Sequence, residues 1–116
     1  MEHGKKGRKF GRETKQRKEL MCDLAEALIS RGKITTSQAK AKSLRPYIEK
    51  VITKSKINNV ATARFLASRF SRAAIKKLLQ EIGPKFTGRS GGYTRIVNLP
   101  RRLSDGAKMA IIEFVG

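Results

Sequence analysis

Residues 36–56 read TSQAKAKSLRPYIEKVITKSK. Apolar side chains recur through this stretch at helical spacing and fall on one stripe: Ala41, Leu44, Ile48, Val51 and Ile52. Thr36 or Ser37 supplies a hydroxyl for the N-cap, so we predict a helix that ends near Lys56. Pro46 normally ends or kinks a helix. Because the stripe keeps its phase across Pro46, we predict one kinked helix rather than two.

A second amphipathic helix is predicted before this stretch. Thr14 is a candidate N-cap, and Gly32 after Arg31 is a candidate left-handed terminus. The predicted buried stripe consists of Leu20, Met21, Leu24, Ala25 and Leu28. The opposite side carries three carboxylates: Glu19, Asp23 and Glu26. We expect this acidic face to point to solvent or to a basic partner, because phosphate would be repelled there. Residues 33–36 contain three β-branched side chains after Lys33 and predict a brief strand.

Helices also follow the deciding stretch, and strands come last. A short helix is predicted over residues 60–70, and the next has its stripe at Ile75, Leu78, Leu79 and Ile82. Gly83-Pro84 is a typical stop signal. Residues 85–92 have the composition of a loop, and strands are predicted near 93–99 and 109–115. The expected fold is therefore α+β, with helices packed on a small mixed three-stranded sheet.

Residues 1–13 differ in composition from the remainder. Five of them are Lys or Arg and three are Gly, and Phe10 is the only large apolar side chain after Met1. Such a segment buries too little surface to offset the entropy lost on ordering. We predict an extended basic arm over residues 1–13, disordered until RNA binds, and a single globular domain over residues 14–116.

The charge of the chain points to a polyanionic partner. The sequence has 27 Lys and Arg against nine Asp and Glu, which gives a formal net charge of +18. This excess repels itself in a compact fold unless a partner neutralises it. Nucleic acid is the commonest such partner, because Lys and Arg release the counterions condensed on phosphate.

Other function classes lack the residues that they require. The longest uninterrupted apolar run, residues 109–112, is far short of the roughly 20 residues of a membrane span. Cys22 is the only cysteine and His3 the only histidine, so we expect no intrachain disulfide, metal site, cofactor or catalytic residue. We also expect no membrane partner and no small-molecule substrate. One free cysteine fits a reducing cytoplasm.

RNA binding needs cations that reach phosphate, a backbone that follows a groove, and flat side chains for stacking. The segment 1–18 contributes Lys5, Lys6, Arg8, Lys9, Arg12, Lys15, Arg17 and Lys18. The loop and the second strand contribute Arg89, Gly91, Gly92, Tyr93 and Arg95, and the turn between the two C-terminal strands contributes Arg101 and Arg102. Tyr93 has two interpretations of equal weight, a ring that stacks on RNA and a ring that packs in the sheet.

Two rival classes remain at this point. A DNA-packaging protein would have similar charge, although the sequence has no recognition-helix signature, zinc finger or heptads that continue from a basic region. An RNA-modifying enzyme would lose its turnover on a single substitution, and Cys22→Ala is the simplest test. We interpret Cys22 as a small packing residue rather than a nucleophile, because the only imidazole, His3, is nineteen residues away in the basic arm.

Several blocks of the sequence, spread over nearly the whole chain, are distinctive in their order and spacing. The N-terminal blocks are Met1-Glu2-His3 with Gly7-Arg8, Arg12 and Arg17, and Ile34-Thr35-Thr36 with Lys40-Ala41-Lys42 and Leu44-Arg45. The C-terminal blocks are Gly83-Pro84-Lys85-Phe86, Arg89, Gly91-Gly92-Tyr93-Thr94-Arg95-Ile96, and Met109-Ala110 with Ile112-Glu113. Taken together, these blocks resemble the bacterial large-subunit ribosomal protein seventeen family, and their order and spacing make the resemblance specific.

The resemblance implies a structural constituent of the large ribosomal subunit that binds large-subunit ribosomal RNA near the exit side of the peptide tunnel. It also implies neighbouring large-subunit ribosomal proteins as partners, location on cytoplasmic ribosomes, and a place for His3 among the RNA-binding residues. The chain departs from the family pattern at Glu2, Gln16 and Ser104.

Overall fold

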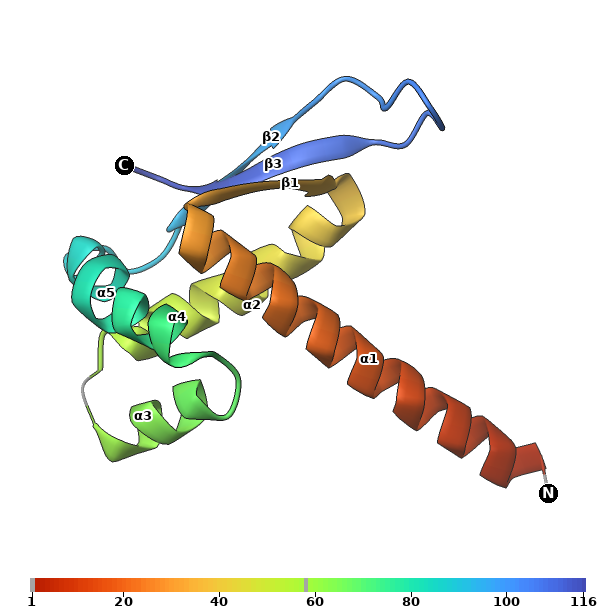
Figure 1. Ribbon diagram of the computed structural model, residues 1–116, viewed down its shortest axis with the longest axis horizontal. Helices are drawn as coiled ribbons and strands as arrows, with labels where there is room; N and C mark the ends of the chain where they lie inside the picture. The colour runs from red at the N-terminus through yellow and green to blue at the C-terminus, as the bar shows by residue number, and fades with distance from the viewer. Residues whose placement is uncertain (1, 58) are drawn as a thin grey trace.

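The computed structural model describes the backbone of residues 2–57 and 59–116, and the side chains of residues 13–57 and 59–116. The helical elements are α1 (Glu2–Arg31), α2 (Gln38–Ser55), α3 (Val60–Ala67), α4 (Arg72–Lys77), the π-helical turn η1 (Leu78–Ile82) and α5 (Gly83–Lys85). The strands are β1 (Lys33–Ser37), β2 (Thr94–Asn98) and β3 (Met109–Phe114). The helices pack on one face of the sheet, and this arrangement confirms the predicted α+β class (Figure 1).

The sheet has the order β1-β3-β2, with β3 in the centre. Both neighbours run antiparallel to β3, so the expectation of a mixed sheet was wrong. The reason is that a direct hairpin connects β2 to β3, and β1 also pairs antiparallel with β3 on its other edge. Ile34 and Ile96 both lie opposite Ile112 in the register, which places three isoleucines in one row on the helix-covered face.

Helix α2 lies at the centre of the packing. It contacts all three strands together with α1, α3, η1 and α5. Its stripe is buried as predicted: Ala41, Leu44, Ile48, Val51 and Ile52 are each 0% exposed. Ser37 is the N-cap, with its hydroxyl accepting a hydrogen bond from the Lys40 amide at 3.2 Å. The helix is a single element through Pro46, which confirms the prediction of one helix.

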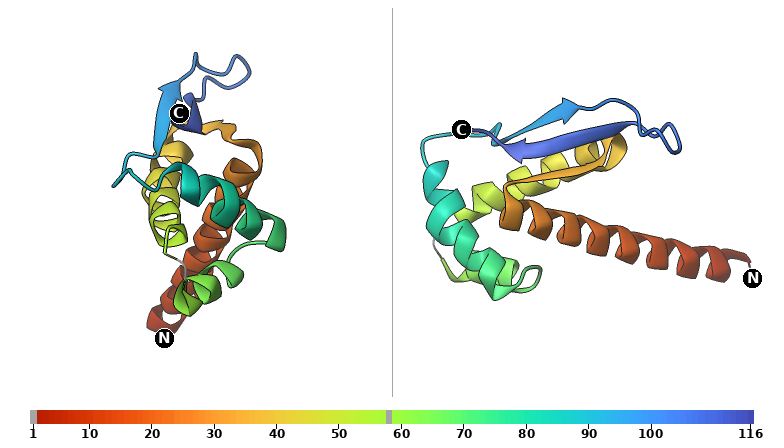
Figure 2. Two further views of the ribbon diagram at one scale, coloured as in Figure 1. Left: turned by 90° about the vertical axis from the view of Figure 1, so that its left-hand side faces the viewer. Right: turned by 45° about the horizontal axis from the view of Figure 1, so that its top comes forward.

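Helix α1 begins much earlier than the sequence indicated. Its backbone is helical from Glu2, so the predicted start at Thr14 was wrong. The C-terminal half packs on the body through Ala25, Leu28 and Ile29, whereas Leu20 is 37% exposed where the helix leaves the body. The N-terminal half projects beyond α2 (Figure 2). It stays a prediction that residues 1–13 become ordered only when RNA binds.

The end of α1 follows the sequence signal. Gly32 has φ +83°, a left-handed conformation that a side chain would strain, and its amide donates to the Leu28 carbonyl. The chain then turns directly into β1.

Elements α4, η1 and α5 form one helical rod from Arg72 to Lys85. The predicted stop at Gly83-Pro84 was therefore wrong. Pro84 lies in the first turn of α5, where its missing N–H is not needed. Leu79, which lies within the π turn, is 38% exposed although the predicted stripe included it, whereas Leu78 and Ile82 of the same turn are buried.

Gly83 lies where the rod approaches the end of α2. A Cβ atom there would lie 2.9 Å from the Leu78 carbonyl oxygen and 3.2 Å from the Ser55 carbonyl oxygen, both of which belong to the backbone. A side chain would therefore force the rod and α2 apart.

Gly83→Ala is expected to lower the free energy of unfolding by about 1–3 kcal/mol, the usual range for overpacking. Urea denaturation followed by circular dichroism measures it. Gly88→Ala is the matched control, because a Cβ at Gly88 meets nothing within 4 Å. Equal stability of the two variants would contradict the close approach.

Candidate nucleic-acid interface

Most of the positive charge in the described part of the chain has no carboxylate partner. Five of the 27 Lys and Arg residues lie within residues 1–12, whose side chains the structure does not describe. Of the other 22, two form ion pairs, which are Arg95–Glu113 and Arg102–Asp105. The described surface is therefore strongly cationic, and its acids neutralise little of it.

The loop between α5 and β2 is held on α2 by one carboxylate. Glu49 accepts a hydrogen bond from the Gly92 amide at 3.1 Å and one from the Tyr93 amide at 2.8 Å. Hydrogen bonds to an ionised acceptor are the stronger kind. Glu49 therefore fixes the backbone just before β2 begins.

Lys56, the C-cap of α2, holds the other end of the same loop. Its ammonium donates to the Phe86 carbonyl at 3.2 Å and also to the Arg89 carbonyl. The same nitrogen lies 4.7 Å from the centre of the Tyr93 ring, within the range of a cation–π contact. Lys56 is thus a structural cation that shapes the loop from within.

Tyr93 packs in the core, which decides between its two interpretations. It is 0% exposed, and its ring centre lies 5.1 Å from that of Phe86. Its hydroxyl donates to the Arg89 carbonyl at 3.1 Å and lies 3.2 Å from the Thr53 hydroxyl. With both faces covered, this ring has no surface on which an RNA base could stack.

The exposed part of the loop presents Arg89 and the glycine backbone. Arg89 is exposed, and its Nε donates to the Gly91 carbonyl at 3.2 Å. Gly91 is half-buried and Gly92 is exposed, so a phosphate chain can come close to the backbone. The loop therefore supplies two of the features predicted for it, a cation and accessible backbone, without the stacking ring.

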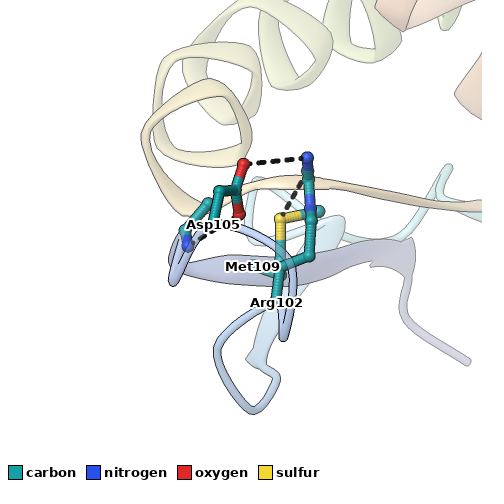
Figure 3. A network of polar contacts seen from close by, with 4 residues as sticks. Arg102, Asp105 and Met109 are labelled. Atoms are coloured by element: carbon teal, nitrogen blue, oxygen red, sulfur yellow. Dashed lines mark hydrogen bonds and ion pairs between the residues drawn. The ribbon is translucent and has the colours of Figure 1, made fainter.

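The three predicted arginines near the hairpin already have partners. Arg95 pairs with Glu113 at 2.7 Å across β2 and β3. In the turn after β2, Arg101 donates to the Gly106 carbonyl at 3.1 Å. Arg102 reaches Asp105 at 3.4 Å and Met109 Sδ at 3.0 Å, as Figure 3 shows. All three remain exposed, but Arg95 and Arg102 carry less net charge to a ligand.

The predicted residues of α1 form a third region. Lys15, Arg17 and Lys18 are exposed on the helix. The remaining predicted side chains lie outside the described residues: His3, Lys5, Lys6, Arg8, Lys9 and Arg12. The α1 end, the loop before β2 and the hairpin turn lie at three separate ends of the molecule (Figure 1). The predicted residues thus form three contact regions and no single pocket.

The acidic face of α1 is partly structural. Glu19 and Asp23 are exposed, as expected. The Glu26 carboxylate instead accepts a hydrogen bond from the Ser71 amide at 2.7 Å, which ties α1 to the start of α4. This backbone hydrogen bond lowers the pKa of Glu26 from its ordinary value, with the Ser71 hydroxyl adding to the effect.

Glu49 and Lys56 were not predicted as residues that organise the interface. One signal was available, because Glu49 is the only acid in a helix that has several Lys and Arg residues. An isolated carboxylate in such a helix marks a candidate structural contact. The sequence offers no comparable signal for Lys56.

Membrane-spanning helices and metal clusters are both absent from the part of the chain that the structure describes. No helix there combines the length and the apolar character needed to cross a membrane. Among the same described residues, no cluster of three or more His, Cys, Asp or Glu side chains is placed to hold a metal ion.

Comparison with known proteins identifies close relatives. The family model described as ribosomal protein L17 matches residues 20–115. A protein named large ribosomal subunit protein bL17 from Nautilia profundicola is 46% identical, with 100% of this chain and 99% of the relative covered. Relatives with the same name come from Hydrogenobaculum sp. (47% identical; 99% of each chain) and Persephonella marina (48% identical; 99% of this chain, 95% of the relative).

Glu49→Ala is expected to lower the free energy of unfolding by about 1–3 kcal/mol, because two amides lose a charged acceptor. Glu49→Gln keeps one acceptor oxygen and should have a smaller effect. Urea denaturation gives the stability, and amide hydrogen exchange of Gly92 and Tyr93 reports the loop.

Glu81→Ala serves as the control, since Glu81 is exposed on η1. Unchanged exchange rates at both amides in Glu49→Ala would show that the carboxylate does not hold the loop.

Proposed function

The chain belongs to the ribosomal protein L17 family, and on that premise we propose that it is a structural constituent of the large ribosomal subunit. It binds and stabilises large-subunit ribosomal RNA and in this way supports translation. The relatives are named as large-subunit proteins, and the match to them covers essentially the full length of both chains. This chain does the same work in its own ribosome.

The main support for RNA binding is the number of cations that have no carboxylate partner. Two ion pairs among the described residues leave most Lys and Arg side chains without a carboxylate, at a formal net charge of +18. RNA phosphates supply the missing negative charge, and the release of their counterions favours binding. The protein in turn lowers the repulsion between RNA strands that approach each other.

The separation of the cationic regions determines how the protein holds RNA. In the right-hand view of Figure 2, the α1 end and the hairpin turn lie apart from each other on one side of the molecule, and the loop before β2 lies on the opposite side. They contact different RNA segments and join them through the rigid body. Selectivity then comes from the shape of the RNA backbone and its 2′-hydroxyl groups more than from base edges.

Position and partners follow from the family resemblance. We extend the proposal to a location near the exit side of the peptide tunnel on cytoplasmic ribosomes, with other large-subunit proteins as neighbours. The proposal includes no catalytic step, because a structural constituent acts by binding. DNA packaging is the alternative function, because net charge alone does not distinguish a DNA-binding protein from an RNA-binding one.

Cosedimentation distinguishes the two. In a sucrose gradient of a cell extract, the protein is expected to migrate with the large subunit and to leave that fraction after ribonuclease treatment. Deoxyribonuclease treatment is the control and should change nothing. Migration with the nucleoid, or release by deoxyribonuclease alone, would contradict the proposal.

The arm should account for part of the salt dependence of RNA binding. In the Arg8→Glu, Arg12→Glu double variant, the slope of log K against log salt should fall by about 0.7–0.9 for each phosphate that the arm no longer neutralises. Filter binding to large-subunit RNA at several salt concentrations measures it. The Arg8→Lys, Arg12→Lys variant keeps both charges and should keep the slope. An unchanged slope in the Glu variant would contradict the proposal that the arm contacts RNA.

A further inference from the structure

A groove lies where α1 leaves the body. It has a volume of about 340 Å³, in the range of small-ligand sites, and is open to solvent. Residues of α1, α2 and the turn after α3 line it: Thr14, Arg17, Lys18, Met21, Cys22, Tyr47 and Arg69. Two of these, Arg17 and Lys18, belong to the segment already expected to meet RNA.

The exposed surface of this groove is mostly apolar, and all of its charged lining residues are cations. Arg17, Lys18 and Arg69 line it, and no carboxylate is among its lining residues. Arg17 also lines an adjoining groove of about 370 Å³ that includes Lys40. Cations thus continue across the base of α1 from one groove to the next, as a track for a phosphate chain requires.

Arg69 is held in place before any ligand arrives. Its Nη1 donates to the Ser68 hydroxyl at 2.9 Å and to the Phe65 carbonyl at 3.4 Å. Its guanidinium carbon lies 4.1 Å from the centre of the Phe65 ring. The guanidinium also interacts with the Tyr47 hydroxyl, which lowers the pKa of that group against the larger effect of burial. Arg69 therefore lies between Phe65 and Tyr47 with its charge beside the groove.

The wall of the groove is flat and uncharged. Tyr47 is half-buried, and its hydroxyl lies 3.2 Å from Cys22 Sγ, which fixes the orientation of the ring. Burial, and then the contact with Cys22, raises the pKa of Tyr47 to about 12. The hydroxyl is therefore neutral at physiological pH and does not repel phosphate. Met21 adds a polarisable apolar side chain beside it.

We propose that this groove binds one unpaired nucleotide of RNA, with its base against Tyr47 and Met21 and its phosphate on Arg17, Lys18 and Arg69. The inference rests on the proposed function, since it requires that the chain bind RNA. The nucleotide must be unpaired, because bases within an RNA duplex are stacked on one another and do not reach a protein groove.

The combination of features favours a nucleotide over a side chain of another protein. An inserted apolar side chain would cover Tyr47 and Met21 but would leave three cations without a counter-charge. A bare phosphate would satisfy the cations but would leave the aromatic wall exposed. A nucleotide satisfies both, in the way that single-stranded nucleic acids combine base stacking with backbone neutralisation.

Cys22 makes the proposal directly testable. It is the only cysteine of the chain and lines the groove, so a thiol reagent reports on this site alone. The full chain is mixed with transcribed large-subunit ribosomal RNA, and RNA binding is verified by filter retention. Alkylation of Cys22 by iodoacetamide should then slow at least about tenfold well above the Kd, because only unbound protein reacts.

Variants separate the groove from general coverage by RNA. Tyr47→Leu should weaken RNA binding about tenfold and lose the protection of Cys22, whereas Tyr47→Phe keeps the ring and should bind as wild type. Arg69→Gln should also lose protection. Arg64→Gln, the same change at an exposed residue of α3 outside the groove, should keep it. Circular dichroism verifies that each variant is folded.

The outcomes are distinguishable. RNA binding without protection of Cys22, and with Tyr47→Leu as tight as wild type, would overturn the nucleotide groove and leave the proposed function intact. Absence of RNA binding would overturn both. Protection that appears only in the assembled subunit, and not with RNA alone, would overturn the inference in favour of a neighbouring protein.

Discussion

The burial of α2 is the constraint on which the rest of the structure depends. Its stripe is completely inaccessible, and its surroundings include all three strands, α1 and the rod from Arg72 to Lys85. Because apolar burial is the dominant favourable contribution to folding, these contacts fix where the sheet and the other helices lie. This helix also supplies the Ser55 carbonyl that lies close to Gly83 and the Glu49 carboxylate that holds the loop before β2. The candidate interface is therefore organised from the core outward.

A second constraint is the mutual repulsion of the cations. Few of the described acids form ion pairs with these cations. The carboxylates of Glu26 and Glu49 instead accept hydrogen bonds from backbone amides of other elements and so connect those elements. Lys56 serves the same purpose with the opposite sign by binding loop carbonyls. These charged groups thus connect the elements of the fold, whereas most exposed cations have no carboxylate partner among the described residues. This division explains how a chain of net charge +18 can have a defined core.

The sequence predicts the parts of this fold that depend on local periodicity. The stripe through Ile48, the Ser37 cap and the left-handed Gly32 are all observed. Two features are missed. The π turn that contains the exposed Leu79 has no marker in the local pattern, and the early start of α1 lies in a segment with weak helical signals. Of the candidate site, Lys15, Arg17, Lys18 and Arg89 are exposed, and their contact with RNA stays a prediction. Burial of Tyr93 depends on its contact with Phe86, which sequence spacing does not reveal.

The continuity of α1 has a mechanical consequence. A helix advances about 1.5 Å per residue, so residues 2–13 add roughly 18 Å to the length of α1. A flexible segment would let its tip and the globular part adopt independent positions. A continuous helix instead relates the position of the tip to the orientation of the body.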